Sequence, residues 1–127
     1  MKATLWIIII LAAAIITVGL VSDNVSAKVV KEYSGQAIQI KENIKKDDWE
    51  GARRITQDME KKWKETCEWL QFWVDHQDTD NVNLALKKIL AAIEVQSLDS
   101  YYQADAELME GLDHVQHRDA LTIGNLL

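Results

Sequence analysis

A stripe of apolar side chains at helical spacing between Trp49 and Val74 is the feature that most constrains the fold of this chain. At about 100° per residue, these side chains fall within roughly a third of a helical wheel, and charged side chains occupy the rest. The stripe consists of Trp49, Ala52, Ile55, Thr56, Met59, Trp63, Thr66, Cys67, Leu70, Trp73 and Val74. The chain contains no proline that would interrupt it. We therefore expect one long amphipathic helix over residues 49–73, against which the other segments pack. Asp47 and Glu50 have the spacing of a capping box at its start.

Four of the five tryptophans lie in this helix, and large aromatic side chains at helical spacing favour core packing over a ligand-stacking site. Two aromatic residues depart from the stripe. Trp69 lies just beside it, and Phe72 lies well outside it. These two residues are therefore predicted to be an interaction surface for another protein or for a membrane surface.

Three further helices are expected, over residues 28–46, 82–96 and 99–118, each with its own apolar stripe. Short connections between them favour antiparallel neighbours. The predicted fold is all-α, with an N-terminal transmembrane helix followed by an antiparallel bundle of about four helices arranged as helical hairpins. Residues 120–127 are expected to fold back onto this bundle, which forms one domain over residues 28–127.

The N-terminal segment contains seventeen residues without a charge, from Leu5 to Val21. As a helix it would rise about 25 Å, at the short edge of what crosses a bilayer. Residues 1–27 are therefore predicted to be an uncleaved transmembrane anchor that contacts membrane lipid through residues 5–21. Lys2 favours a cytoplasmic N-terminus and an extracytoplasmic C-terminal domain. The alternative is a signal segment that is cleaved near Ala27, which would release a secreted domain.

Charge is distributed unevenly along the chain, whose net charge is −6. Residues 28–64 carry ten Lys or Arg and seven Asp or Glu, whereas residues 65–127 carry three Lys or Arg and twelve Asp or Glu. The acidic balance argues against a nucleic-acid partner. One explanation of the pattern is that the basic and acidic helices attract each other when they fold together. The other is that the basic half of the domain lies near anionic lipid headgroups, with the acidic half farther from the membrane.

No motif for catalysis, cofactor binding or metal binding is present, and the chain is not expected to be an enzyme. Cys67 is the only cysteine, which excludes an internal disulfide, and a buried inert thiol is expected. The polar run Asp75, His76, Asp78 and Asp80 carries possible cation ligands, but it lacks the glycine and the terminal glutamate of a calcium loop. The structural interpretation makes Asp80 the N-cap of the next helix. His114 and His117 are expected at a helix C-terminus, where they complement the helix dipole.

The chain resembles domain-of-unknown-function family 4363, a family of short proteins from clostridia and related bacteria with an N-terminal membrane segment and a helical remainder. The residues that carry the resemblance across the chain are Asp48 to Ala52, Trp63, Lys64, Trp69, Trp73, Asp75, His76, Asp80 to Val82, Leu86, Ile89, His114, Val115 and Leu121 to Leu127. The chain departs from the family pattern at Gln77 and Asp78, where a Glu is usual, and at His117, where proline is common. The family has no assigned activity, so the resemblance implies architecture and location only.

These observations favour a structural or protein-interaction module at the cell envelope, with a membrane or envelope protein as its partner. The alternative is a secreted or envelope binding or sensor module with a metal or pH site around Asp75 to Asp80.

Overall fold

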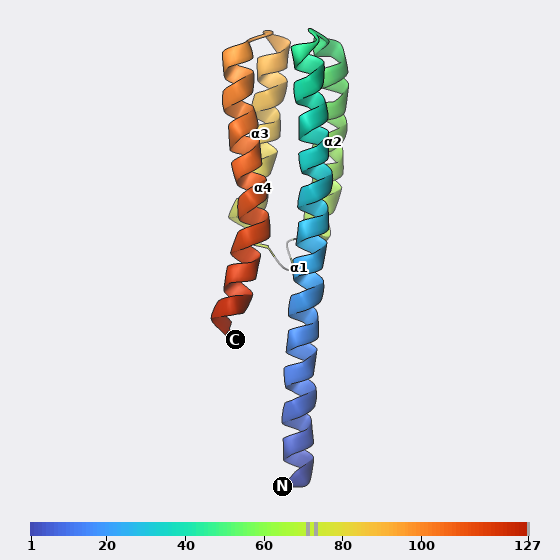
Figure 1. Ribbon diagram of the computed structural model, residues 1–127, viewed down its shortest axis with the longest axis vertical. Helices are drawn as coiled ribbons and strands as arrows, with labels where there is room; N and C mark the ends of the chain where they lie inside the picture. Colours follow the sequence, from blue (N-terminus) through green and yellow to red (C-terminus); the bar gives the residue numbers. More distant parts are fainter. Residues whose placement is uncertain (71, 73, 127) are drawn as a thin grey trace.

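The part of the chain that the structure describes is all-helical, with four helices in antiparallel succession (Figure 1). The computed structural model describes the backbone of residues 1–70, 72 and 74–126, and their side chains except 19, 22, 23 and 117–126. The helices are α1 (Lys2–Lys45), α2 (Trp49–Leu70), α3 (His76–Glu94) and α4 (Leu98–Leu126). Contacts join α1 with α2, α2 with α3, α3 with α4, and α4 with α1. The helices therefore surround one core. Helix α2 contacts α1 and α3 but not α4, so the prediction that all the other segments pack against it was wrong.

Helix α1 is much longer than the first bundle helix predicted from sequence, because it continues upstream without a break as far as Lys2. The first buried residue among its described side chains is Ser26, at 1 % exposure, and Val29, Val30 and Tyr33 continue the buried face. Upstream of this point α1 extends past the connection between α2 and α3, with the C-terminal part of α4 alongside, and its N-terminal part projects beyond all the other helices (Figure 1). The apolar N-terminal run and the first bundle helix are thus two parts of one rod.

The structure corrects the prediction of an N-terminal transmembrane anchor. Among the helices as far as the structure describes them, none has an apolar stretch long enough to cross a membrane. The physical reason is length, since seventeen helical residues rise about 25 Å and a bilayer's hydrocarbon core is about 30 Å thick. The predicted single-pass location, with a cytoplasmic N-terminus and an extracytoplasmic domain, is corrected with it.

The connection between α1 and α2 is a tight turn that is capped differently from the prediction. Asp47 has a positive φ of 63°, and its side chain accepts a hydrogen bond from Trp49 Nε1 at 3.0 Å. The cap of α2 comes from Asp48, whose Oδ1 accepts the Gly51 N–H at 3.0 Å. The predicted cap was therefore one residue too early, because Asp47 is occupied in forming the turn.

The apolar stripe of α2 faces the core as predicted, with Ala52, Thr56, Met59, Trp63 and Leu70 buried. It packs against α1 and α3, and its buried residues belong to one continuous core to which all four helices contribute. Trp73 lies outside the described residues.

Two helix boundaries differ from the prediction. Helix α3 begins at His76 instead of residue 82, because the Asp75 side chain accepts the Gln77 N–H and caps the helix six residues earlier. Helix α4 continues to Leu126, so its last residues extend the helix and do not fold back as a separate tail. His114 consequently lies within α4 and not at its C-terminus.

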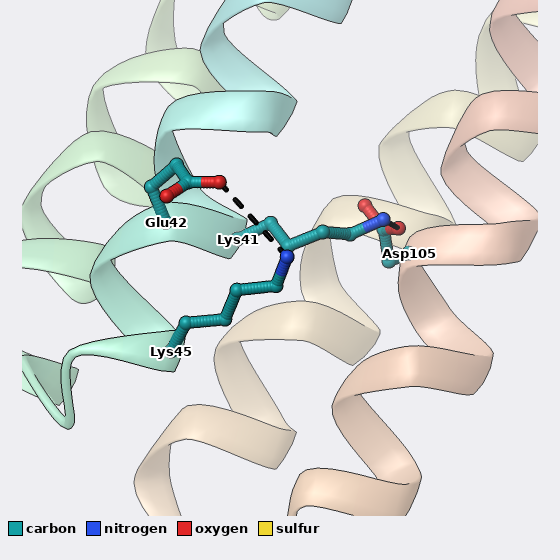
Figure 2. Close-up of polar contacts among 4 residues, drawn as sticks. All are labelled: Lys41, Glu42, Lys45 and Asp105. Atoms are coloured by element: carbon teal, nitrogen blue, oxygen red, sulfur yellow. Dashed lines mark ion pairs between the residues drawn. The ribbon is translucent and has the colours of Figure 1, made fainter.

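Helices α1 and α4 are linked across the core's edge by an ion pair (Figure 2). Lys41 Nζ lies 3.0 Å from Asp105 Oδ2, and the Asp105 side chain is only 9 % exposed. Lys45 and Glu42, on the same helix as Lys41, make a looser pair at 4.0 Å. A nearly buried carboxylate is stable only with such a partner, so this pair fixes the registry between the first and last helices.

Candidate functional site

The most unusual surface of the molecule is apolar and lies at one end of the bundle. We call this surface the apolar end, and define it as residues 5–21 of α1 together with Trp69 and Phe72. The large apolar side chains described between Leu5 and Val21 are each 48–63 % exposed. A helix that is apolar on all sides is normally buried against other apolar groups, so this segment calls for a partner.

The two aromatic residues predicted as an interaction surface lie at the same end of the bundle. Phe72 is 83 % exposed and Trp69 is 39 % exposed. Phe72 belongs to the connection between α2 and α3, which lies at the end of the bundle from which α1 projects (Figure 1). The structure therefore brings both aromatic residues to the level at which the apolar part of α1 leaves the core.

The position of α2 beside α1 is fixed by an aromatic contact near this end. Tyr33 and Trp63 meet edge to face with ring centroids 5.1 Å apart. Tyr33 Oη and Thr66 Oγ1 share a hydrogen bond at 3.0 Å. Because α1 and α2 run in opposite directions, the last turn of α2 then lies beside Val29 and Ser26 of α1.

The chemistry of the apolar end suits burial and not catalysis. Residues 5–21 contain no charged side chain. The one hydroxyl of this segment is on Thr17, and it donates to the Ala13 carbonyl at 2.8 Å. Burying this segment therefore leaves no polar side-chain group without a hydrogen bond, apart from the Trp6 indole N–H. The favourable free energy of burial comes from removing apolar surface from water.

The polar turn from Asp75 to Asp80 is organised by structural hydrogen bonds. Asp75 caps α3, and the Thr79 hydroxyl donates to the His76 carbonyl at 2.8 Å. Asp78 is buried at 2 % exposure, whereas His76 and Asp80 are exposed. Within the described part of the chain, no three His, Cys, Asp or Glu side chains are grouped to hold a metal ion. The cation-site hypothesis for this turn stays a prediction.

Cys67 lacks the lowered pKa that activates a catalytic thiol. The Cys67 thiol is half-buried, and burial raises its pKa to about 11, so the thiolate is scarce at neutral pH. His114 is exposed, with Nε2 at 4.0 Å from Glu110. The His117 side chain lies outside the described residues.

Sequence reasoning missed a groove between α3 and α4. Its floor is made of small residues, among them Ala91, Ala104 and Gly111. The signal available in the sequence was the helical spacing of these small residues on α3 and on α4. Which of them lie opposite one another depends on how the two helices are aligned in the bundle, and the sequence does not show that.

Comparison with known proteins places the bundle, with α1 from residue 20 onward, in one family. A family model described as "Domain of unknown function (DUF4363)" matches residues 20–126, which confirms the resemblance seen in the sequence. No curated protein and no solved structure matches the chain.

Proposed function

The chain belongs to the DUF4363 family, and from that premise we propose that it is a protein-interaction module, a helical bundle that presents its apolar end to another protein. The observation that carries this proposal is the exposure of the large apolar side chains between Leu5 and Val21, at 48–63 % each. The proposal assigns no catalytic step to the chain.

The size of the surface supports this function. A helical segment of seventeen residues is about 25 Å long and about 10 Å across, so its side surface is about 800 Å². Each partner in a standard protein–protein interface contributes about 800 Å². The projecting segment therefore provides a complete binding surface to a partner that surrounds it, and about half of one to a partner that packs on a single side.

Trp69 and Phe72 support the same function from the bundle side. Aromatic side chains are enriched among the residues that carry most of the binding energy in interfaces. Phe72 is 83 % exposed and Trp69 is 39 % exposed, so Phe72 offers a partner the larger fraction of its side chain. A partner that packs along residues 5–21 reaches these two side chains where α1 enters the bundle.

The partner's chemistry follows from the absence of charge. A partner surface that pairs with residues 5–21 is itself apolar, and Ala12, Ala13 and Ala14 in the middle of the segment allow a partner helix to approach closely. Charged partner surfaces are excluded, since their charges would lose water without gaining a counterion.

The experiment is co-purification of the full-length chain from its native cells, with Phe72→Ser compared with the unsubstituted chain. Phe72→Ser is expected to leave the unfolding free energy unchanged within about 0.5 kcal/mol, because the residue is exposed, and to remove the co-purifying protein. Ile38→Ser is the matched control, since Ile38 is 59 % exposed on the bundle away from the apolar end.

Two outcomes would contradict the proposal. The first is a partner that is retained by Phe72→Ser and by Trp69→Ser alike. The second is flotation of the purified chain with phospholipid vesicles while no protein co-purifies, which would make lipid the occupant of the apolar end.

A further inference from the structure

A groove runs along the outer side of the bundle between α3 and α4, on a different surface from the apolar end. It has two lobes of about 430 Å³ and 320 Å³. Both lobes are lined by Lys88 and Glu107, so they form one continuous groove. On α3 the lining extends from Asn81 to Val95, a length of about 21 Å or four helical turns.

The groove exists because the residues at its floor are small. Ala91, Ala92 and Ala104 line one lobe, and Gly111 lines the other. A Cβ atom at Gly111 would meet the Val82 side chain at 3.1 Å, so the glycine permits the close approach of the two helices. Two large apolar side chains stand at the groove and are exposed, namely Leu84 at 52 % and Val95 at 72 %. The groove therefore offers a small-residue floor with an apolar side chain in each lobe, the form of a site for a helix.

An ion pair crosses the groove at its middle. Lys88 Nζ lies 2.8 Å from Glu107 Oε2, and both side chains are 49 % exposed. Exposed pairs of long flexible side chains contribute little to stability. The pair can therefore separate and free a carboxylate for an incoming cation without loss of the fold.

The charge of this surface is acidic. The Lys, Asp and Glu side chains that line the groove are one lysine, Lys88, and two acids, Glu107 and Glu110, and all three are exposed. Complementary charge steers partners and excludes those of like sign.

We propose that the α3/α4 groove docks a basic amphipathic helix of a partner protein. The apolar face of that helix lies on the small-residue floor between Leu84 and Val95. Its lysines or arginines face Glu107 and Glu110 on the α4 side of the groove, and one of them takes the place of Lys88 beside Glu107. This surface is separate from the apolar end, so the inference does not depend on the function proposed above.

The test uses two synthetic peptides of about sixteen residues, long enough for four helical turns. Both have the same Leu and Ala face, and they carry either lysines or glutamates on the opposite face. Binding to the full chain is measured by fluorescence anisotropy, and the contacted residues are mapped by NMR chemical shifts. The lysine peptide is expected to bind at least about tenfold more tightly than the glutamate peptide, with a preference that falls as salt rises.

A variant inside the groove and one outside it separate groove docking from general charge attraction. Ala91→Lys places a long cationic side chain in the groove and is expected to weaken the lysine peptide by about tenfold or more. Ala106→Lys adds the same charge on an exposed position of α4 that does not line the groove, and is expected to have a much smaller effect. Phe72→Ser, at the apolar end, is expected to leave peptide binding unchanged.

The expected chemical-shift changes lie on α3 between Asn81 and Val95 and on the facing residues of α4. Equal binding of the two peptides, or equal weakening by Ala91→Lys and Ala106→Lys, would overturn the proposal. Shifts confined to residues 5–21 would overturn it as well, by moving peptide binding to the apolar end. Concentration-dependent shifts in the groove without peptide would make a second copy of the chain its occupant in place of a basic helix.

Discussion

Tyr33 and Trp63 pack edge to face across the α1/α2 interface, with their planes at 90° and their ring centroids 5.1 Å apart. Trp63 is fully buried, and its Nε1 donates to the Thr79 carbonyl of α3 at 3.0 Å. One side chain of α2 therefore contacts both neighbouring helices. The indole aligns α1 by ring packing and α3 by a hydrogen bond.

Trp63→Phe is expected to lower the unfolding free energy by about 3 kcal/mol, because it removes a buried hydrogen bond and leaves a cavity. Urea denaturation followed by circular dichroism measures the change. Trp49→Phe is the matched control, since the Trp49 hydrogen bond to Asp47 is exposed and the substitution should cost less than about 1 kcal/mol. Equal losses in the two variants would show that Trp63 does not join the helices in this way.

The glycines of α1 and α2 should respond in opposite directions to alanine. At Gly35 an added Cβ atom would meet no other atom within 4 Å, so Gly35→Ala is expected to stabilise the chain by about 0.5–1 kcal/mol through helix propensity. At Gly51 a Cβ atom would collide with the Asp48 carboxylate that caps α2, so Gly51→Ala should lose the cap and destabilise by about 1 kcal/mol. Thermal unfolding of the two variants side by side gives both signs. A stabilised Gly51→Ala would contradict the assignment of the cap to Asp48.

The ion pair between α1 and α4 is expected to matter more than pairs within a helix. Lys41→Met leaves the nearly buried Asp105 carboxylate without its cation, and should cost about 1–2 kcal/mol in chemical denaturation. Lys62→Met removes the exposed pair with Asp58 on α2 and should have little effect. If the two substitutions prove equivalent, Asp105 does not depend on Lys41.

Stability is expected to fall on the alkaline side. Burial raises the pKa of Cys67 to about 11 from its ordinary value of 9.0, and burial also raises the pKa of Tyr33 and of Tyr101. The unfolded chain therefore loses these protons first, so the stabilisation is complete below about pH 9 and is lost as pH rises toward 11. Unfolding free energies measured from pH 7 to pH 11 test the direction. Cys67→Ala should flatten part of this fall, and an unchanged curve would remove Cys67 as a cause.

The sequence predicted the helical class, the buried face of α2 and the exposure of Trp69 and Phe72, because each follows from side-chain spacing along a single helix. The residues at which helices begin were harder to predict from the sequence. The choice between Asp47 and Asp48 as the cap depends on the positive φ of Asp47, and the early start of α3 depends on the Asp75 side chain. Both are decided by backbone geometry at a turn.

Relations between helices could not be derived from periodicity. The prediction that all the other segments pack against α2 was wrong, because the four helices share the core around a ring and α2 contacts only α1 and α3. The pairing of Lys41 with Asp105 and the α3/α4 groove depend on the registry of the packed helices. The apolar segment and the amphipathic helix that follows it were predicted as separate elements, whereas they form one continuous helix, α1.

Photo-crosslinking in native cells would show whether the apolar end binds a protein. A photoreactive amino acid is placed at position 72 or, as the control, at position 38 of the full-length chain. We expect a discrete protein adduct at position 72 that is absent at position 38 and is weakened by a charge introduced with Ile10→Glu. Identical adducts at both positions, or adducts at position 72 with lipid alone, would contradict protein binding at the apolar end.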